Sequence, residues 1–244
     1  LNAMFNGKGG AAAIKPGVEV EVEVKGEEVV VECEEDPSLA VQAFKAVARL
    51  AGVKSGAYIR IRSEVPAGVG LKTSSAVANA VLLASSRAMD VDLTPDEILR
   101  LNVHVSKLVG VSKTGAMDDA SASLLGGYVI TDNEFMKIIK RGTLNEDLKV
   151  VILIRGRKVY TRDVNVEKYK RLSGEAEKAY EMAIKGDIWE ALTLNGLLVC
   201  KAMGYDPSPI FDALRAGAVA AGVTGKGPAV VAVFDEGDSA GLVR

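Results

Sequence analysis

The sequence of 244 residues is poor in the side chains that build histidine and cysteine sites. His104 is its only histidine, and its two cysteines, Cys33 and Cys200, lie far apart. A metal site with several histidines is therefore excluded, and we interpret His104, inside an expected helix, as structural rather than as part of a histidine triad. The two distant cysteines predict reduced thiols rather than a disulfide framework.

The sequence also lacks a block of basic residues and a long apolar run. Its 30 Lys and Arg against 32 Asp and Glu give a net charge of −2, so general nucleic-acid or membrane-surface binding has no electrostatic support. No apolar run reaches the roughly 18 residues that span a bilayer, and no signal-peptide pattern opens the sequence. With 48% apolar and 25% charged residues, we expect a globular cytoplasmic protein of one large or two small domains.

Hydrophobic patterns predict a mixture of strands and helices. Val alternates with Glu over residues 18–24, which predicts a half-buried strand, and residues 29–31 are its expected partner across a turn at Gly26. Thr94-Pro95-Asp96-Glu97 predicts a capped helix start. Further expected helices are 37–51, 76–89, 166–185, 187–203 and 207–216, and further strands are 57–62, 128–131, 148–154 and 229–234.

Three stretches predict the domain organisation and its boundary. The glycine-rich residues 6–10 are expected to be flexible, and the polar residues 140–147 are expected to join two domains, residues 1–145 and 146–244. The continuous apolar run 148–154 predicts a strand that is buried on both faces.

A glycine-rich loop lies between the strand expected at 57–62 and the helix that follows it. Pro66, Gly68 and Gly70 prevent regular structure, and residues 73–75, Thr-Ser-Ser, supply hydroxyls at the first helical turn. Exposed N–H groups and roughly half a positive charge from the helix dipole would make this a phosphate cradle, to which Lys72 could add a full charge. A plain connector is the alternative, and the loop is neither a Walker motif nor a dinucleotide fingerprint.

Two more stretches contain chemistry-bearing residues among small ones. Asp118 and Asp119 are adjacent, and because neighbours on a helix point about 100° apart, we expect only one carboxylate to face a given site, with the other capping, pairing with a base or reaching solvent. The alternative is a helix start whose acids only complement its dipole. Residues 221–228 contain three glycines that would allow the backbone to approach a ligand, to which Thr224 would offer a donor and Lys226 a charge. The alternative is a plain glycine-rich turn.

Together these stretches resemble, in order and spacing, the three motifs of the GHMP small-molecule kinases. The sequence is most similar to the archaeal-type shikimate kinases in Thr-Gly-Ala-Met-Asp-Asp-Ala at 114–120 and in Asn2-Ala3 followed by Gly7-Lys8-Gly9. Further matches are Tyr128-x-Ile130-Thr131-Asp132-Asn133, Leu194-Asn195-Gly196 and Ala216-Gly217-Ala218.

The resemblance implies an α+β fold of two lobes, a ribosomal-protein-like N-terminal domain and a ferredoxin-like C-terminal domain, with nucleotide between them. The implied activity is transfer of the γ-phosphoryl group of ATP to the 3-hydroxyl of shikimate, with Mg²⁺, in chorismate and aromatic amino acid biosynthesis. The alternatives are a homoserine or other small-alcohol kinase on the same fold, or a non-catalytic nucleotide-binding relative. The resemblance also implies a further strand before Leu1 and another near the C-terminus.

Site residues follow from the same resemblance. The implied base is Asp118, with Asp119 as the alternative, and crowding should raise the pKa of one of them. A hydroxyl of Ser74 or Ser75 would lie near Mg²⁺. The ATP phosphates would be held by Pro66, Ala67, Gly68, Val69, Gly70, Leu71, Lys72, Thr73, Ser74 and Ser75. Substrate would be held by Asn2, Lys8, Gly9, Thr114, Thr224, Gly225, Gly227, Arg155 and Arg157.

The arginines have two interpretations. Arg155 or Arg157 could bind the shikimate carboxylate through two parallel hydrogen bonds, or both could belong to a solvated basic turn. Lys72 departs from the broader superfamily, which prefers a small residue there, and residues 103–113 look shorter than in the family.

Overall fold

The computed structural model describes residues 1–145, 147–154 and 156–235, without the side chain of Arg162. This part of the chain mixes helices and strands, which confirms the α+β class. The strands are β1 Lys8–Ala12, β2 Val18–Val24, β3 Val29–Glu32, β4 Ala57–Ser63, β5 Tyr128–Asp132, β6 Lys137–Gly142, β7 Lys149–Leu153, β8 Ala220–Val223 and β9 Val230–Phe234. The helices are α1 Ser38–Ala51, α2 Thr73–Ala88, α3 Pro95–Val109, α4 Met117–Leu125, α5 Val166–Lys170, α6 Ser173–Lys185, α7 Ile188–Met203 and α8 Ser208–Arg215, with a 3₁₀ turn, η1, at Thr161–Asp163.

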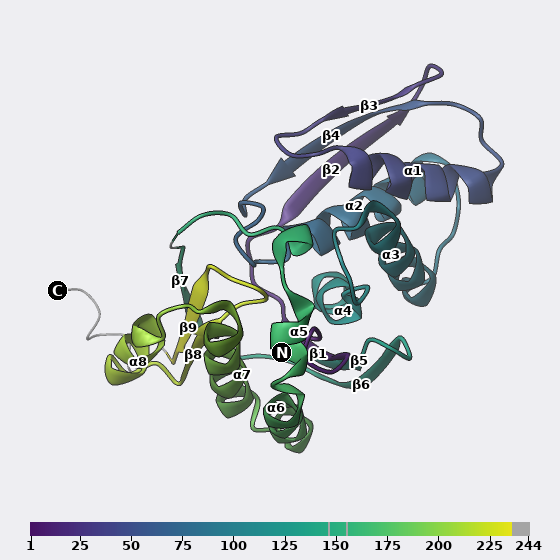
Figure 1. Cartoon of the computed structure of the whole chain (residues 1–244). Coiled ribbons are helices and arrows are strands. Elements are labelled where there is room, and N and C mark those ends of the chain that lie inside the picture. The colour runs from purple at the N-terminus through teal and green to yellow at the C-terminus, as the bar shows by residue number, and fades with distance from the viewer. Residues whose placement is uncertain (146, 155, 236–244) are drawn as a thin grey trace.

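The strands of the described residues form three sheets of three strands each, ordered β2-β4-β3, β1-β5-β6 and β7-β9-β8. Figure 1 shows the first sheet at the top, with α1 against it, and the third at the lower left beside α7 and α8. No helix among the described residues is both long enough and apolar enough to cross a membrane.

Two separate apolar cores stabilise the two ends of the molecule. Phe44, Ile59 and Leu82 are fully buried between the β2-β4-β3 sheet and helices α1 and α2. A second core forms around Tyr169 and Phe234, where α5, α7 and α8 pack with the third sheet. Burial of such side chains contributes about 1.5–3 kcal/mol each, so each end has its own source of stability and the surface between them is free for a site.

The predicted pairing of β2 with β3 is wrong, because β4 lies between them. β4 pairs antiparallel with β2 along its whole length, from Val24 opposite Ala57 to Val18 opposite Ser63, and parallel with β3. Gly56 permits this insertion: its N–H donates to the carbonyl of Gly26 at 2.9 Å, and a Cβ on Gly56 would lie 2.0 Å from the Glu28 carbonyl oxygen.

The glycine-rich N-terminal segment is ordered rather than flexible. Lys8–Ala12 forms β1, which pairs antiparallel with β5, with Gly10 opposite Ile130. A Cβ on Gly9 would lie 2.6 Å from the Asp118 carboxyl carbon. Glycine there therefore allows a close approach of two segments, which is a different reason for glycine from chain mobility.

Three further predictions fail in the second half. β7 is not buried on both faces, since Val151 is 50% exposed and Leu153 is 44% exposed. The reason is that, among the described residues, α7 and α8 pack on β8 and β9 and leave β7 uncovered at the other edge of the sheet. The single helix expected over 166–185 is interrupted at Leu172. Residues 140–142 of the expected junction belong to β6, and neither β6 nor β8 was predicted.

We predict that Gly196→Ala lowers the free energy of unfolding by about 1–3 kcal/mol, the usual cost of overpacking. Gly196 lies on α7, where a Cβ would be 2.3 Å from the Cα of Gly222 on β8. Urea unfolding followed by circular dichroism measures the change. The matched control is Gly174→Ala on α6, where no atom lies within 4 Å of the added Cβ and better helix propensity should leave stability equal or slightly higher. An unchanged midpoint for Gly196→Ala would contradict this packing.

Candidate active site

The glycine-rich loop, the acidic helix start and the last glycine loop meet at one pocket. The predicted site residues that line it are Asn2, Gly68, Gly70, Lys72, Thr73, Ser74, Ser75, Thr114, Asp118, Asp119 and Gly225. Lining residues that the sequence analysis missed include Ser106, Ser112 and Thr161, and Lys226, considered there as a charge in the last glycine loop, also lines the pocket.

Helix α2 presents its first turn to this pocket. It begins at Thr73, three residues earlier than predicted, and the three hydroxyls lie within its first turn. The Thr73 hydroxyl donates to the Pro66 carbonyl at 3.2 Å, Ser75 is buried and Ser74 is exposed. No side chain caps this helix end, and the first N–H groups of a helix have no partners within it. The arrangement leaves donors and the positive end of a dipole at the pocket.

Both carboxylates of the acidic motif are buried at the start of α4. Asp118 is 2% exposed and Asp119 is 6% exposed, and both line the pocket. The prediction that only one could face a given site is therefore wrong. Ala116, in the left-handed conformation (φ 52°), places the chain so that the first helical turn carries both acids inward.

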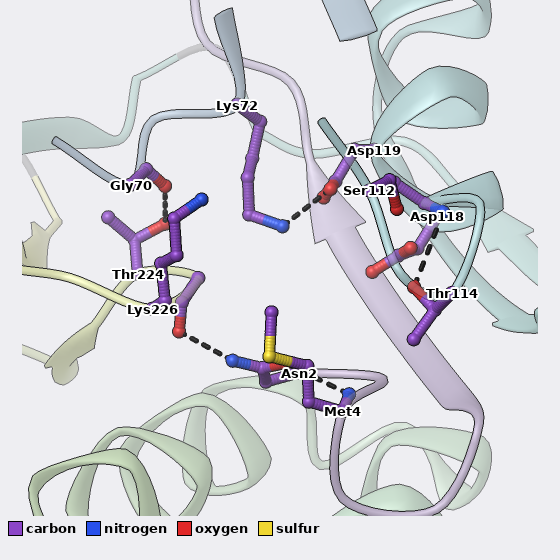
Figure 2. Close-up of polar contacts among 12 residues, drawn as sticks. Asn2, Met4, Gly70, Lys72, Ser112, Thr114, Asp118, Asp119, Thr224 and Lys226 are labelled. Atoms are coloured by element: carbon purple, nitrogen blue, oxygen red, sulfur yellow. Dashed lines mark hydrogen bonds and ion pairs between the residues drawn. The ribbon is translucent and has the colours of Figure 1, made fainter. Parts of the chain in front are cut away.

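Each carboxylate has its own partner. The Lys72 ammonium donates to Asp119 Oδ2 at 2.5 Å, which matches the prediction that one acid would pair with a base. Lys72 itself is left-handed (φ 63°), and Figure 2 shows its side chain extending across the site to Asp119. Asp118 Oδ1 instead accepts a hydrogen bond at 2.9 Å from the Asn133 side chain, at the end of β5.

Burial and the adjacent Asp118 charge raise the pKa of Asp119 to about 6, although the attraction of Lys72 partly opposes them. Burial would lower the pKa of Lys72, but the attraction of Asp119 and Asp118 outweighs it and the net shift is upward. The pair is therefore a carboxylate and an ammonium above about pH 6. It combines a base that titrates near neutrality with a fixed positive charge.

The last glycine loop, between β8 and β9, closes against the first. Thr224 donates from its hydroxyl to the Gly70 carbonyl at 3.1 Å. A Cβ on Gly70 would lie 2.4 Å from the Thr224 carbonyl oxygen, and one on Gly225 would lie 2.5 Å from Lys72 Cε. Asn2 reaches the same loop and donates from its side chain to the Gly225 carbonyl at 2.7 Å. These glycines allow backbone contact between the loop before α2 and the loop between β8 and β9, so the latter is more than a plain turn.

A buried amide network, which sequence reasoning missed, connects the first turns of α2 and α4. Asn102 on α3 donates to the Ser75 carbonyl at 2.9 Å and to Asn79 Oδ1 at 2.7 Å. Asn79 on α2 donates to the Ala120 carbonyl at 2.9 Å, and Ser106 donates to Asn102 Oδ1 at 3.1 Å. The available signal was the position of both asparagines on the apolar sides of their helices, since buried polar groups need partners.

Several predicted residues lie outside the lining of the pocket. Lys8 is ion-paired with Glu177, and Gly9 packs behind Asp118. Arg157 is exposed, and Arg155 lies outside the described residues. The remaining residues that do not line the pocket are Pro66, Ala67, Val69, Leu71, Thr224 and Gly227.

We predict that Asn102→Ala lowers the free energy of unfolding by about 1–3 kcal/mol for each buried group it leaves without a partner. Ser106→Ala is the matched control because it removes a single hydrogen bond of the same network and should cost about 1 kcal/mol. Urea unfolding of both variants measures the difference. Equal losses in the two variants would mean that Asn102 does not hold α2 against α4.

Comparisons with known proteins agree with one another. Residues 38–127 match the family model of the GHMP kinases N terminal domain. The chain is 42% identical over 238 residues to the shikimate kinase of Methanothrix thermoacetophila, covering 97% of this chain and 82% of that protein. It is 40% identical over 242 residues to the shikimate kinase of Pyrococcus furiosus, covering 97% of this chain and 88% of that protein.

Solved structures are similar in fold at much lower identity. The Methanococcus jannaschii mevalonate kinase has a TM-score of 0.76 at 18% identity, and the match covers 97% of this chain and 87% of that one. The Lactococcus lactis galactokinase complexed with galactose has a TM-score of 0.72 at 14% identity, with 82% of that chain and 97% of this one covered. At such identities these two structures support the fold alone.

Proposed function

Because the chain belongs to the shikimate kinases of the GHMP kinase superfamily, we propose that its pocket transfers the γ-phosphoryl group of ATP to the 3-hydroxyl of shikimate. The products are ADP and shikimate 3-phosphate, in the biosynthesis of chorismate and the aromatic amino acids. The observation that carries the mechanism is the Lys72–Asp119 pair, which lies in one pocket with the first turn of α2.

The first turn of α2 binds the phosphates in this proposal. Its free N–H groups and dipole attract an anion. Lys72 adds a full positive charge at the same place. Because phosphoryl transfer passes through a loose transition state, positioning and neutralisation of the phosphate oxygens are the main catalytic tasks.

The residues at this end of the pocket fit Mg²⁺. Mg²⁺ prefers oxygen ligands, keeps several waters and is usually held by few protein groups together with substrate phosphates. The described residues contain no cluster of three or more His, Cys, Asp or Glu that could hold a metal alone. The Ser74 and Ser75 hydroxyls, which line the pocket, would hold the ion together with substrate phosphates and water, and the ion would neutralise charge on the β- and γ-phosphates.

Asp119 is the general base in this proposal, and Asp118 orients the acceptor. The motif favoured Asp118, but a pKa of about 6 at Asp119 suits a base near neutral pH. Asp119 takes the proton of the 3-hydroxyl, the hydroxyl oxygen forms its bond to the γ-phosphorus, and the bridging oxygen leaves with ADP. Asp118, held by Asn133, accepts a hydrogen bond from a substrate hydroxyl.

The acceptor lies between the acids and the N-terminal segment in this proposal. Asn2, Thr114 and Gly225 line that side of the pocket, and Figure 2 shows Asn2 and Thr114 around the space in front of the acids. The proposal also includes a cytoplasmic location, which is supported by Cys33 and Cys200 being free thiols.

We predict ATP turnover with shikimate and not with homoserine or mevalonate. A coupled ADP-release assay with the three alcohols side by side measures this, and mass spectrometry of the product identifies the phosphorylated hydroxyl. Preferred turnover of homoserine or mevalonate would assign the chain another acceptor. ATP binding with no turnover of any alcohol would support a non-catalytic relative instead.

We predict that Asp119→Asn lowers kcat by about 10²–10⁴, the range for losing a general base, without a comparable loss of stability. For the unchanged protein, kcat/KM should fall as the pH drops below about 6, because protonated Asp119 cannot accept the hydroxyl proton. Asp118→Asn is the comparison and should raise KM for shikimate more than it lowers kcat. If turnover of Asp119→Asn stays within threefold of the unchanged protein while Asp118→Asn loses kcat, the base is Asp118.

A further inference from the structure

Lys226 is a second lysine of the pocket, and the mechanism above does not use it. It lies in the loop between β8 and β9, and its ammonium contacts the Thr161 hydroxyl at 3.0 Å. No carboxylate among the described residues forms an ion pair with it, whereas Lys72 is paired with Asp119. The pocket therefore contains one lysine with a counter-ion and one without.

The surroundings of Lys226 disfavour its charge. Burial and the nearby Lys72 lower the pKa of Lys226 to about 8, and the attraction of Asp119 offsets this only in part. Lys226 is half-buried, and a cation partly removed from water, with no counter-ion among the described residues, is unfavourable unless hydrogen bonds or an anion compensate. A ligand with negatively charged oxygens would supply the counter-ion that the described residues do not provide for Lys226.

The position of the ammonium is set by its neighbours. The Thr161 hydroxyl donates to the Val111 carbonyl at 2.8 Å, so its oxygen is directed to accept from Lys226. The Tyr205 hydroxyl donates to the Lys226 carbonyl at 3.0 Å, which fixes the backbone of the loop. Figure 2 shows Lys226 beside Thr224 and Gly70, on the opposite side of the site from the acids.

Resting on the proposed function, we propose that Lys226 binds an oxyanion group of a substrate, with Thr161 as the residue that positions its ammonium. Two groups have this chemistry, the γ-phosphoryl group of ATP and the carboxylate of shikimate. Either would pair with Lys226 while Lys72 stays with Asp119. Lys226 is thus a binding residue whose charge the substrate, not the protein, neutralises.

The test measures binding by calorimetry, separately from turnover. Lys226→Met keeps most of the side-chain volume and removes the charge, and three ligands are compared: ADP, a non-hydrolysable ATP analogue and shikimate. Loss of one charge-assisted hydrogen bond should weaken one ligand by about 10- to 100-fold. Lys201→Met on α7 is the control, since that side chain is 66% exposed and 3.8 Å from Glu175, away from the pocket.

The pattern across the ligands identifies the oxyanion. Weaker binding of the ATP analogue, with ADP and shikimate unchanged, assigns Lys226 to the γ-phosphoryl group. Weaker binding of shikimate alone assigns it to the carboxylate. All three affinities within twofold of the unchanged protein, or an equal loss for all three, would overturn the proposal.

A second variant covers the case in which Lys226→Met does not fold. Thr161→Val removes the hydroxyl but keeps the shape, and it should weaken the same ligand by a smaller factor, with the other two unchanged. No change in any affinity for Thr161→Val would remove its positioning role. Because nucleotide binding is measured without phosphoryl transfer, an absence of shikimate turnover would refute the proposed function and leave the nucleotide comparison interpretable.

Discussion

Two adjacent carboxylates buried at one helix start are the constraint on which the site depends. Removing two like charges from water is costly unless partners compensate. Lys72 supplies a positive charge to Asp119, Asn133 supplies a hydrogen bond to Asp118, and both acids lie in the first turn of α4, where the helix dipole favours negative charge. The two partners come from different segments of the N-terminal half, the start of α2 and the end of β5, so the acids are compensated only after these segments have packed against α4.

The packing that brings partners to the two acids requires several residues that look unrelated in the sequence. Gly9 is small because β1 passes directly behind Asp118, and Gly70 is small because the last glycine loop contacts the first. Lys72 and Ala116 both adopt left-handed conformations next to the helix starts that they introduce, which is a local cost typical of functional sites. The buried amides of Asn79 and Asn102 then keep α2 and α4 in a fixed relation, so the first turn of α2 stays aligned with the two acids.

Much of this could be predicted because local chemistry signals it. The helix start capped by Thr94, the helix end at residue 51 and the alternating strand β2 occur as predicted, and the three motif stretches meet at one pocket. What failed depends on distant neighbours. Gly26 predicted a hairpin of β2 and β3, because no residue near it indicates that β4 enters between these two strands. Likewise, the apolar run of β7 does not reveal which face of the strand is covered by helices.

The partners of charged side chains in the site could not be predicted from the local sequence either. Lys72 was expected to add a positive charge near phosphate, yet its pairing with Asp119 depends on a backbone conformation that the sequence does not signal. Proteins that act on different alcohols share this fold, so the fold supplies the frame for phosphoryl transfer and cannot select the acceptor. Selection has to reside in side chains that the shared backbone leaves free to vary. In the proposed mechanism these include Asn2, Thr114 and Lys226, which line the pocket beside the first turn of α2 and the acids.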